Sequence, residues 1–112
     1  MSLTRIDYLM LGINISSIEF DYFDEKYLPY IEGHNGTEYA IIKNGCDSEF
    51  CYYGIILKKS DYSGFDRTPV NVLFNSWMIS KLRRNIYNTC NNLFDSQYDK
   101  RNVNLYLITE YC

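Results

Sequence analysis

The sequence predicts an α+β fold in which the elements run strand, helix, strand, strand, helix, strand (β-α-β-β-α-β), with a mixed or antiparallel sheet and two helices packed on one face. Apolar residues alternate near both ends of the chain, at 8–15 and 103–108, and recur at helical spacing between Met78 and Leu93. Of the 112 residues, 46% are hydrophobic and 22% are charged, as in globular proteins. We therefore expect a single domain, residues 1–112.

The first element is expected to be a strand over residues 8–15, because its side chains alternate with a period of two. One face is apolar and consists of Leu9, Leu11, Ile13 and Ile15. The other face consists of Tyr8, Met10, Gly12 and Asn14. The apolar face is expected to point towards the helices and to form the core.

Residues 16–28 favour a helix. Ser16 and Glu19 have the spacing of a capping box, and apolar side chains then recur at helical spacing. These side chains are Phe20, Phe23, Tyr27 and Ile31. Pro29 has no amide hydrogen, so the helix should end near Leu28. The alternation of Ile18, Phe20 and Tyr22 with acidic residues also fits a strand, and the fold would then be a meander with one helix.

A β-hairpin is expected next, with strands at 38–43 and 50–58 on either side of a loop that contains Gly45. Before it lies a glycine-flanked loop, residues 33–36. In the second hairpin strand one face carries Tyr53, Ile55 and Leu57, and the other carries Tyr52, Gly54 and Ile56. Because both faces carry apolar atoms, this strand should be central or covered.

The second helix follows a polar loop, residues 60–69, that ends in Thr68 and Pro69, a helix-start signal. Its apolar stripe consists of Met78, Leu82, Ile86, Cys90 and Leu93. After a polar turn at 95–102, the last strand alternates Val103, Leu105 and Leu107 with Asn104, Tyr106 and Ile108. Both terminal strands should lie in the centre of the sheet.

The charge balance argues against nucleic-acid binding, since the net charge is −3 and the isoelectric point is near 5.0. Acidic residues are concentrated in one segment, which contains Glu19, Asp21, Asp24, Glu25 and Glu32 with only Lys26 to balance them. We expect no signal peptide, because the apolar run at 9–15 is interrupted by Gly12 and Asn14 and lacks a small-residue cleavage site. No run of about 18 apolar residues occurs either, so we expect a soluble, cytoplasmic protein.

No residue pattern indicates an enzyme, a cofactor or a metal site. The single histidine, His34, lies in a glycine-flanked loop, where a solvated turn residue is expected. The four cysteines, Cys46, Cys51, Cys90 and Cys112, lack the paired spacings of a zinc site and are expected to be thiols. The loop at 61–66 carries two aspartates but lacks the ligand spacing of an EF-hand.

Twelve tyrosines against one alanine make the composition unusual. Strand alternation places Tyr8, Tyr52 and Tyr106 on the sheet face opposite the helices, where they could contact another protein. A base-stacking platform is disfavoured because such a surface is normally basic. In a third interpretation the loop at 60–69 covers these rings. The acidic side chains Asp21, Asp24 and Glu25 are further candidates for contact with a partner.

The only compact basic cluster is formed by Lys81, Arg83 and Arg84, with Lys100 and Arg101 in the next loop. Guanidinium and ammonium groups bind phosphate through charge-assisted hydrogen bonds. The cluster could therefore bind an anion such as a nucleotide, with a tyrosine stacking on the base. The alternative is an ordinary solvated helix face.

Three segments resemble a pattern found in small accessory proteins of tailed bacteriophages: residues 8–12 (YLMLG), 53–65 (YGIILKKSDYSGF) and 105–111 (LYLITEY). The resemblance implies a non-enzymatic protein that binds a host protein and inhibits or redirects it in the host cytoplasm. The aromatic and acidic surfaces would then contact the partner. A homodimer, and a protein that binds or sequesters a nucleotide-like small molecule, are the alternatives.

Overall fold

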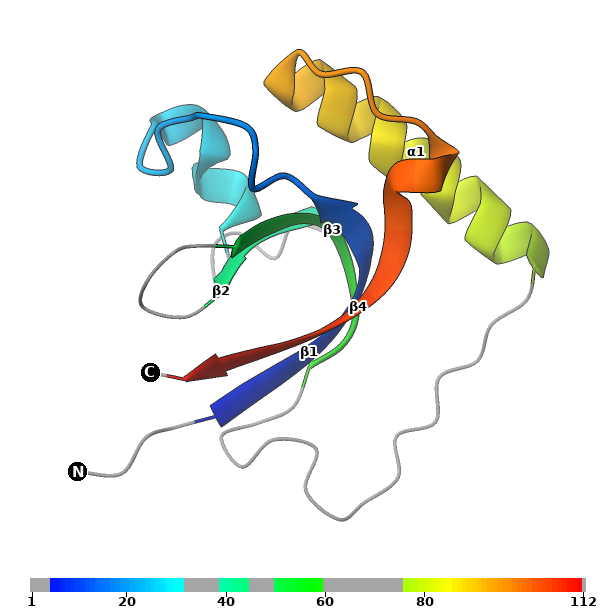
Figure 1. The fold of residues 1–112 in the computed structure, drawn as a ribbon, viewed down its shortest axis with the longest axis horizontal. Coiled ribbons are helices and arrows are strands. Elements are labelled where there is room, and N and C mark those ends of the chain that lie inside the picture. Colours follow the sequence, from blue (N-terminus) through cyan, green and yellow to red (C-terminus); the bar gives the residue numbers. More distant parts are fainter. Residues whose placement is uncertain (1–4, 32–38, 45–49, 60–75, 112) are drawn as a thin grey trace.

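The computed structural model describes residues 5–31, 39–44, 50–59 and 76–111, whose strands form one four-stranded sheet (Figure 1). The elements are β1 (Arg5–Asn14), the 3₁₀ helix η1 (Glu25–Tyr30), β2 (Tyr39–Asn44), β3 (Phe50–Lys59), α1 (Ser76–Phe94), the 3₁₀ helix η2 (Lys100–Asn102) and β4 (Val103–Tyr111). The strand order is β2-β3-β1-β4, and each adjacent pair is antiparallel. The α+β class is confirmed. No helix within the described ranges is long and apolar enough to cross a membrane.

The predicted strands all form, and their side-chain alternation is the predicted one. In the register, Leu11 of β1 lies opposite Ile55 of β3 on one side and Leu105 of β4 on the other. The two hairpin strands pair as β2 and β3. Only β1 of the two terminal strands is central, because β4 lies at an edge of the sheet. The end of β4 is consequently open to solvent, and Leu107 is 68% exposed.

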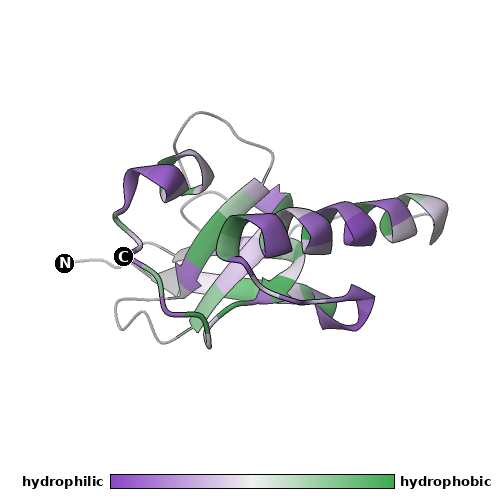
Figure 2. Cartoon of the chain, turned by 90° about the horizontal axis from the view of Figure 1, so that it is seen from above, coloured by the Kyte–Doolittle hydropathy of each residue, from purple (hydrophilic) through white to green (hydrophobic). Residues whose placement is uncertain are grey.

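The predicted second helix is also confirmed, as α1. Its stripe places Ile86 and Cys90 fully inside the protein, against the face of the sheet that carries Leu11 and Ile13. Figure 2 shows mainly hydrophobic strands next to a helix whose visible turns are mainly hydrophilic. Burial of one apolar stripe against the sheet, rather than helix propensity, is the main source of stability for such a helix.

The prediction of a first helix over residues 16–28 is wrong, and so is the arrangement of two helices on one sheet face. Only the short η1 forms, and residues 16–24 contain neither a helix nor a strand. The Ser16 hydroxyl accepts a hydrogen bond from the Cys51 amide (2.9 Å) and therefore does not cap a helix. Asp21 accepts a bond from the Phe23 amide, and Asp24 accepts one from the Lys26 amide. Such local bonds compete with helix formation.

The helical spacing of aromatic residues in this segment has a different origin. Phe20 and Tyr27 both pack on Phe94, the last residue of α1, with ring centroids 5.0 Å and 5.4 Å apart respectively, and 4.8 Å from each other. The segment therefore packs Phe20 and Tyr27 of the predicted stripe against the core with a loop and one 3₁₀ turn, whereas Phe23 stays exposed. Together with α1 and the sheet, these rings form the first core.

The sheet is strongly curved, and β1, β3 and β4 bend along their length (Figure 1). Gly12 of β1 lies opposite Gly54 of β3 at a very close approach of the two strands. A Cβ atom on Gly54 would lie 2.5 Å from the Cα of Gly12 and would also overlap the Leu11 carbonyl oxygen. A β-bulge at Leu57, which has no partner in β1, adds to the bend.

The curvature creates a second core on the face away from α1. The two edge strands, β2 and β4, approach each other to within 8 Å between Cα atoms, so the sheet partly encloses this face. The buried members of the second core are Tyr8, Met10, Ala40, Ile42 and Ile108. On the opposite face of the sheet, the buried Asp7 carboxylate accepts a hydrogen bond from the Thr109 hydroxyl (2.8 Å), which links β1 to β4.

Candidate functional site

The three tyrosines proposed as a contact surface lie on the same sheet face, but that face is the second core. Tyr8 is only 1% exposed and packs with Met10 and Ile108. Tyr52 and Tyr106 are half-buried at its margin, with ring centroids 4.8 Å apart. Burial raises the pKa of Tyr52, and the neighbouring Tyr106 adds to the rise. Tyr8 is therefore a core residue in this structure and cannot contact a partner. Tyr52 and Tyr106 remain partly accessible to solvent.

The acidic loop, residues 19–25, is the second predicted surface. Its carboxylate side chains Glu19, Asp21, Asp24 and Glu25 are all exposed. Asp21 and Asp24 also hold the backbone, because each accepts an amide hydrogen bond from two residues further along the chain. These residues thus define the shape of the loop as well as its charge.

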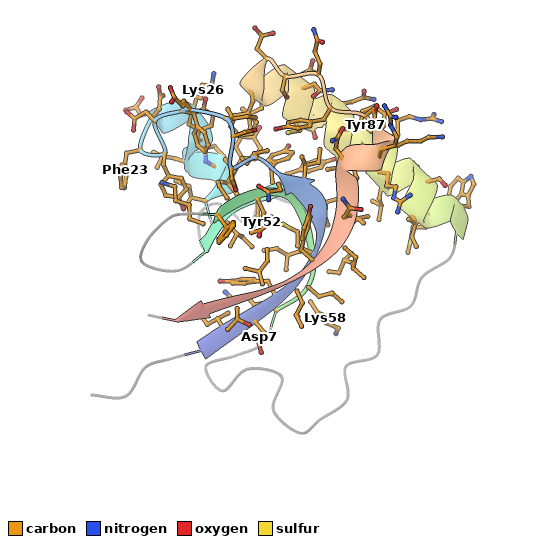
Figure 3. The ribbon with its side chains drawn as sticks, viewed as in Figure 1. Asp7, Phe23, Lys26, Tyr52, Lys58 and Tyr87 are labelled. Carbon is orange, nitrogen blue, oxygen red and sulfur yellow. The ribbon has the colours of Figure 1, made fainter. Side chains whose placement is uncertain are left out.

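Phe23 projects from the acidic loop into solvent. It is 80% exposed, and Figure 3 shows it pointing away from the body of the protein. Its only ring contact within the described residues is with Tyr22, at 5.6 Å between centroids. Tyr22 is held in turn by the Lys43 ammonium, which lies 4.1 Å from its ring centre. The sequence did not reveal this residue as a surface feature, because the predicted helix placed Phe23 on the apolar stripe.

A shallow hollow of about 240 Å³ lies beside the acidic loop. Ser16, Ile18 and Phe20 form part of its wall, and Glu19 and Lys43 stand in its lining. The hollow thus combines apolar walls with one charge of each sign.

The predicted basic cluster forms part of a cleft of about 430 Å³ between α1 and η2, called the basic cleft here. Its lining consists of Ser80, Arg83, Arg84, Tyr87, Lys100 and Arg101. Figure 3 shows Tyr87 on the side of α1 that lies beside η2. The third predicted residue, Lys81, lies outside this cleft. Its ammonium is 5.4 Å from the ring of Trp77, in a neighbouring hollow of about 280 Å³ that shares Ser80 and Arg84 with the cleft.

Asn91 brings η2 back onto α1. Its amide nitrogen donates to the Tyr98 carbonyl (2.8 Å), and its amide oxygen accepts from the Tyr98 amide (2.7 Å) and the Ser96 hydroxyl (2.9 Å). Asp95, the residue after α1, adopts a left-handed backbone conformation with φ of 52°, which turns the chain at the end of the helix. Lys100 and Arg101 are thereby placed next to the arginines of α1.

Asp99 organises the short η2 helix and partly neutralises the basic cleft. Its carboxylate accepts a hydrogen bond from the Arg101 amide (2.8 Å) and forms an ion pair with the Arg101 guanidinium (2.9 Å). The hydrogen bonds from Arg101 lower the pKa of Asp99, and the same contact raises the pKa of Arg101. Arg101 is therefore paired already, unlike the other three cations of the cleft.

Arg83, Arg84 and Lys100 form no ion pair with any carboxylate in the described part of the chain. The Nε of Arg83 is in addition buried and has no hydrogen-bond partner. Buried polar atoms are nearly always hydrogen-bonded, so an unpaired one needs an explanation. The sequence identified the basic residues of this region, but Ser80 and Tyr87 became visible as cleft residues only in the structure.

The two described cysteines are not suited to nucleophilic chemistry. Burial raises the pKa of the Cys51 thiol to about 11 and that of the Cys90 thiol to about 12, and neither forms a disulfide. Thiolates, not thiols, are the reactive species.

The predictions for His34, Cys46, Cys112 and the loops at 33–36 and 60–69 fall outside the described residues. Comparison of the chain with protein-family models, curated proteins and solved structures gave no match.

Proposed function

We propose that this chain is a non-enzymatic binding protein that docks another protein through the acidic loop, with Phe23 as the central contact. The observation that supports this role best is an exposed aromatic ring in a loop whose neighbouring residues Asp21, Asp24 and Glu25 are exposed carboxylates. Burying a phenylalanine side chain contributes roughly 1.5–3 kcal/mol. Aromatic residues at the centre of an interface often dominate its binding energy.

The partner surface that fits this loop is a basic one with an apolar pocket. Carboxylates around the ring would accelerate association and make it sensitive to salt, while Phe23 would slow dissociation. The adjacent hollow, lined by Glu19 and Lys43, offers room for one side chain of the partner. In the context implied by the resemblance to phage accessory proteins, the partner is a host protein in the host cytoplasm, which the chain inhibits or redirects.

Affinity capture from lysates of bacterial hosts tests the proposal. The wild-type protein should retain a basic host protein that Phe23→Ser loses, with a Kd at least about tenfold weaker, because a hot-spot ring contributes 2 kcal/mol or more. Trp77→Ser is the matched control, since Trp77 is also an exposed ring (72%) but lies on α1. This control should capture the protein as the wild type does.

A second variant separates charge from shape. Asp21→Asn, Asp24→Asn and Glu25→Gln together remove three negative charges, while the asparagine oxygens can still accept the two turn hydrogen bonds. The association rate should fall and lose its salt dependence. If Phe23→Ser and this triple variant both retain every protein that the wild type captures, the proposed docking surface is wrong.

A further inference from the structure

The basic cleft concentrates positive charge in an acidic protein. Four of the eleven Lys and Arg residues line it, and its lining contains no carboxylate. Like charges held close together repel each other, and a bound anion removes this repulsion. Asp99 forms its ion pair with Arg101 and also attracts Lys100, so Arg83 and Arg84 are the cations of the cleft that no carboxylate of the described residues pairs with.

The donors of the cleft match the oxygens of a phosphate group. An arginine guanidinium presents a planar fork of N–H groups that binds phosphate in a bidentate manner, and lysine adds a mobile charge. The Nε of Arg83 is buried, so the terminal nitrogens of its guanidinium group are the ones that a ligand would contact. Ser80, one helical turn before Arg84, adds a hydroxyl to the lining. A bound phosphate would therefore satisfy groups that the protein itself leaves unpaired.

The cleft is larger than a phosphate needs, and one of its walls is aromatic. Its volume of about 430 Å³ is typical of sites for small organic molecules, which range over roughly 300–1,000 Å³. Tyr87 follows Arg83 by one helical turn and lines the same space. Stacking of a planar ring on an aromatic side chain contributes to the binding of bases in proteins.

From these observations we infer that the basic cleft is a binding site for a phosphorylated small molecule with an aromatic ring, of the nucleotide class. Arg83, Arg84 and Lys100 bind the phosphate, and Tyr87 contacts the ring. The site is distinct from the acidic loop and does not depend on the protein-binding role. A nucleic-acid strand is a poorer fit, because binding a strand requires a basic groove that follows the backbone over several nucleotides. Here four basic residues converge on one cleft, and Lys81 lies in the adjoining hollow.

Calorimetric titration of the intact protein with chosen probes tests this inference. Nucleoside monophosphates, tested one base at a time, should include one that binds with a Kd of about 1 mM or tighter. The matching nucleoside, which lacks the phosphate, and inorganic phosphate, which lacks the ring, should each bind at least about tenfold more weakly. Stabilisation against thermal unfolding should follow the same order.

Paired variants assign the binding to the cleft. Arg84→Gln with Lys100→Gln removes two exposed positive charges and should weaken monophosphate binding at least about tenfold, since each lost charge-assisted hydrogen bond corresponds to roughly that factor. Lys26→Gln with Lys58→Gln removes the same charge from exposed positions outside the cleft and should bind as the wild type. Tyr87→Leu keeps an apolar side chain and should weaken monophosphate binding without changing phosphate binding.

Three results would overturn the inference. Absence of heat with every monophosphate, while the wild type is folded by circular dichroism, would show that the cleft is not such a site. Equal affinity for inorganic phosphate and the monophosphates would remove the role of the ring. Much tighter binding of a short single-stranded oligonucleotide, with affinity falling steeply as salt rises, would identify a nucleic-acid surface instead.

Discussion

At the scale of single residues, the glycine pair Gly12 and Gly54 determines what the tyrosine-rich sheet face can do. Because neither residue has a Cβ atom, the backbones of β1 and β3 approach closely enough for the sheet to curl over its second face. Tyr8 becomes a core residue for this reason. The sequence indicated which residues share the face, but two glycines in strands do not reveal by how much the strands bend.

Gly54→Ala should therefore destabilise the protein. The new methyl group would overlap the backbone of Leu11 and Gly12, so β1 and β3 would have to separate. Overpacking of this kind typically lowers the free energy of unfolding by about 1–3 kcal/mol, which urea denaturation can measure. A change of less than about 0.5 kcal/mol, the range of neutral surface substitutions, would show that the close approach is not required.

At the scale of elements, the connection from α1 to η2 depends on one side chain. Asn91 makes three side-chain hydrogen bonds to residues 96–98. The resulting turn places Lys100 and Arg101 in the lining of the basic cleft. Such a network rigidifies a segment only while each of its bonds is made.

Asn91→Ala should loosen this connection. The loss of three hydrogen bonds is expected to lower the free energy of unfolding by about 1–3 kcal/mol, because the Tyr98 amide and carbonyl lose their partner. Hydrogen exchange at the amides of residues 96–102 should accelerate, while exchange in β1 should change less. Asn92→Ala, at an exposed neighbouring position, is the matched control. Unchanged exchange in 96–102 would mean that other contacts hold the turn.

The elements also show which parts of the fold a sequence can predict. The stripe of α1 and the alternation in β1 predict structure correctly because each is repeated over many residues. In residues 16–28 the helical spacing depends on three aromatic residues, Phe20, Phe23 and Tyr27, and the packing of Phe20 and Tyr27 on Phe94 accounts for it without a helix. The cleft was partly predictable for a similar reason: Arg83 and Arg84 are local in sequence, whereas Lys100 and Arg101 join them only through the Asn91 turn.

At the scale of the whole molecule, the net charge of −3 conceals two surfaces of opposite character. The acidic loop and the basic cleft are formed by different elements: the loop precedes η1 and the cleft lies between α1 and η2, and η1 and η2 lie apart in Figure 1. A single average charge predicts neither of them. The two proposed sites can therefore be tested one at a time, because variants in one leave the other unaltered.

Global stability should fall in alkaline solution, because the first core keeps two thiols protonated that would ionise in water at that pH. Cys51 and Cys90 have raised pKa values of about 11 and about 12, against an ordinary value of 9.0. Below pH 9 both states of the protein carry the thiol protons. As the pH rises above 9, the unfolded state releases them and the folded state does not, so the free energy of unfolding decreases. Cys51→Ala with Cys90→Ala should reduce the slope of this decrease between about pH 9 and 11, measured by urea denaturation, even if its stability is lower throughout. Identical slopes for the two proteins would show that these thiols do not control the alkaline response.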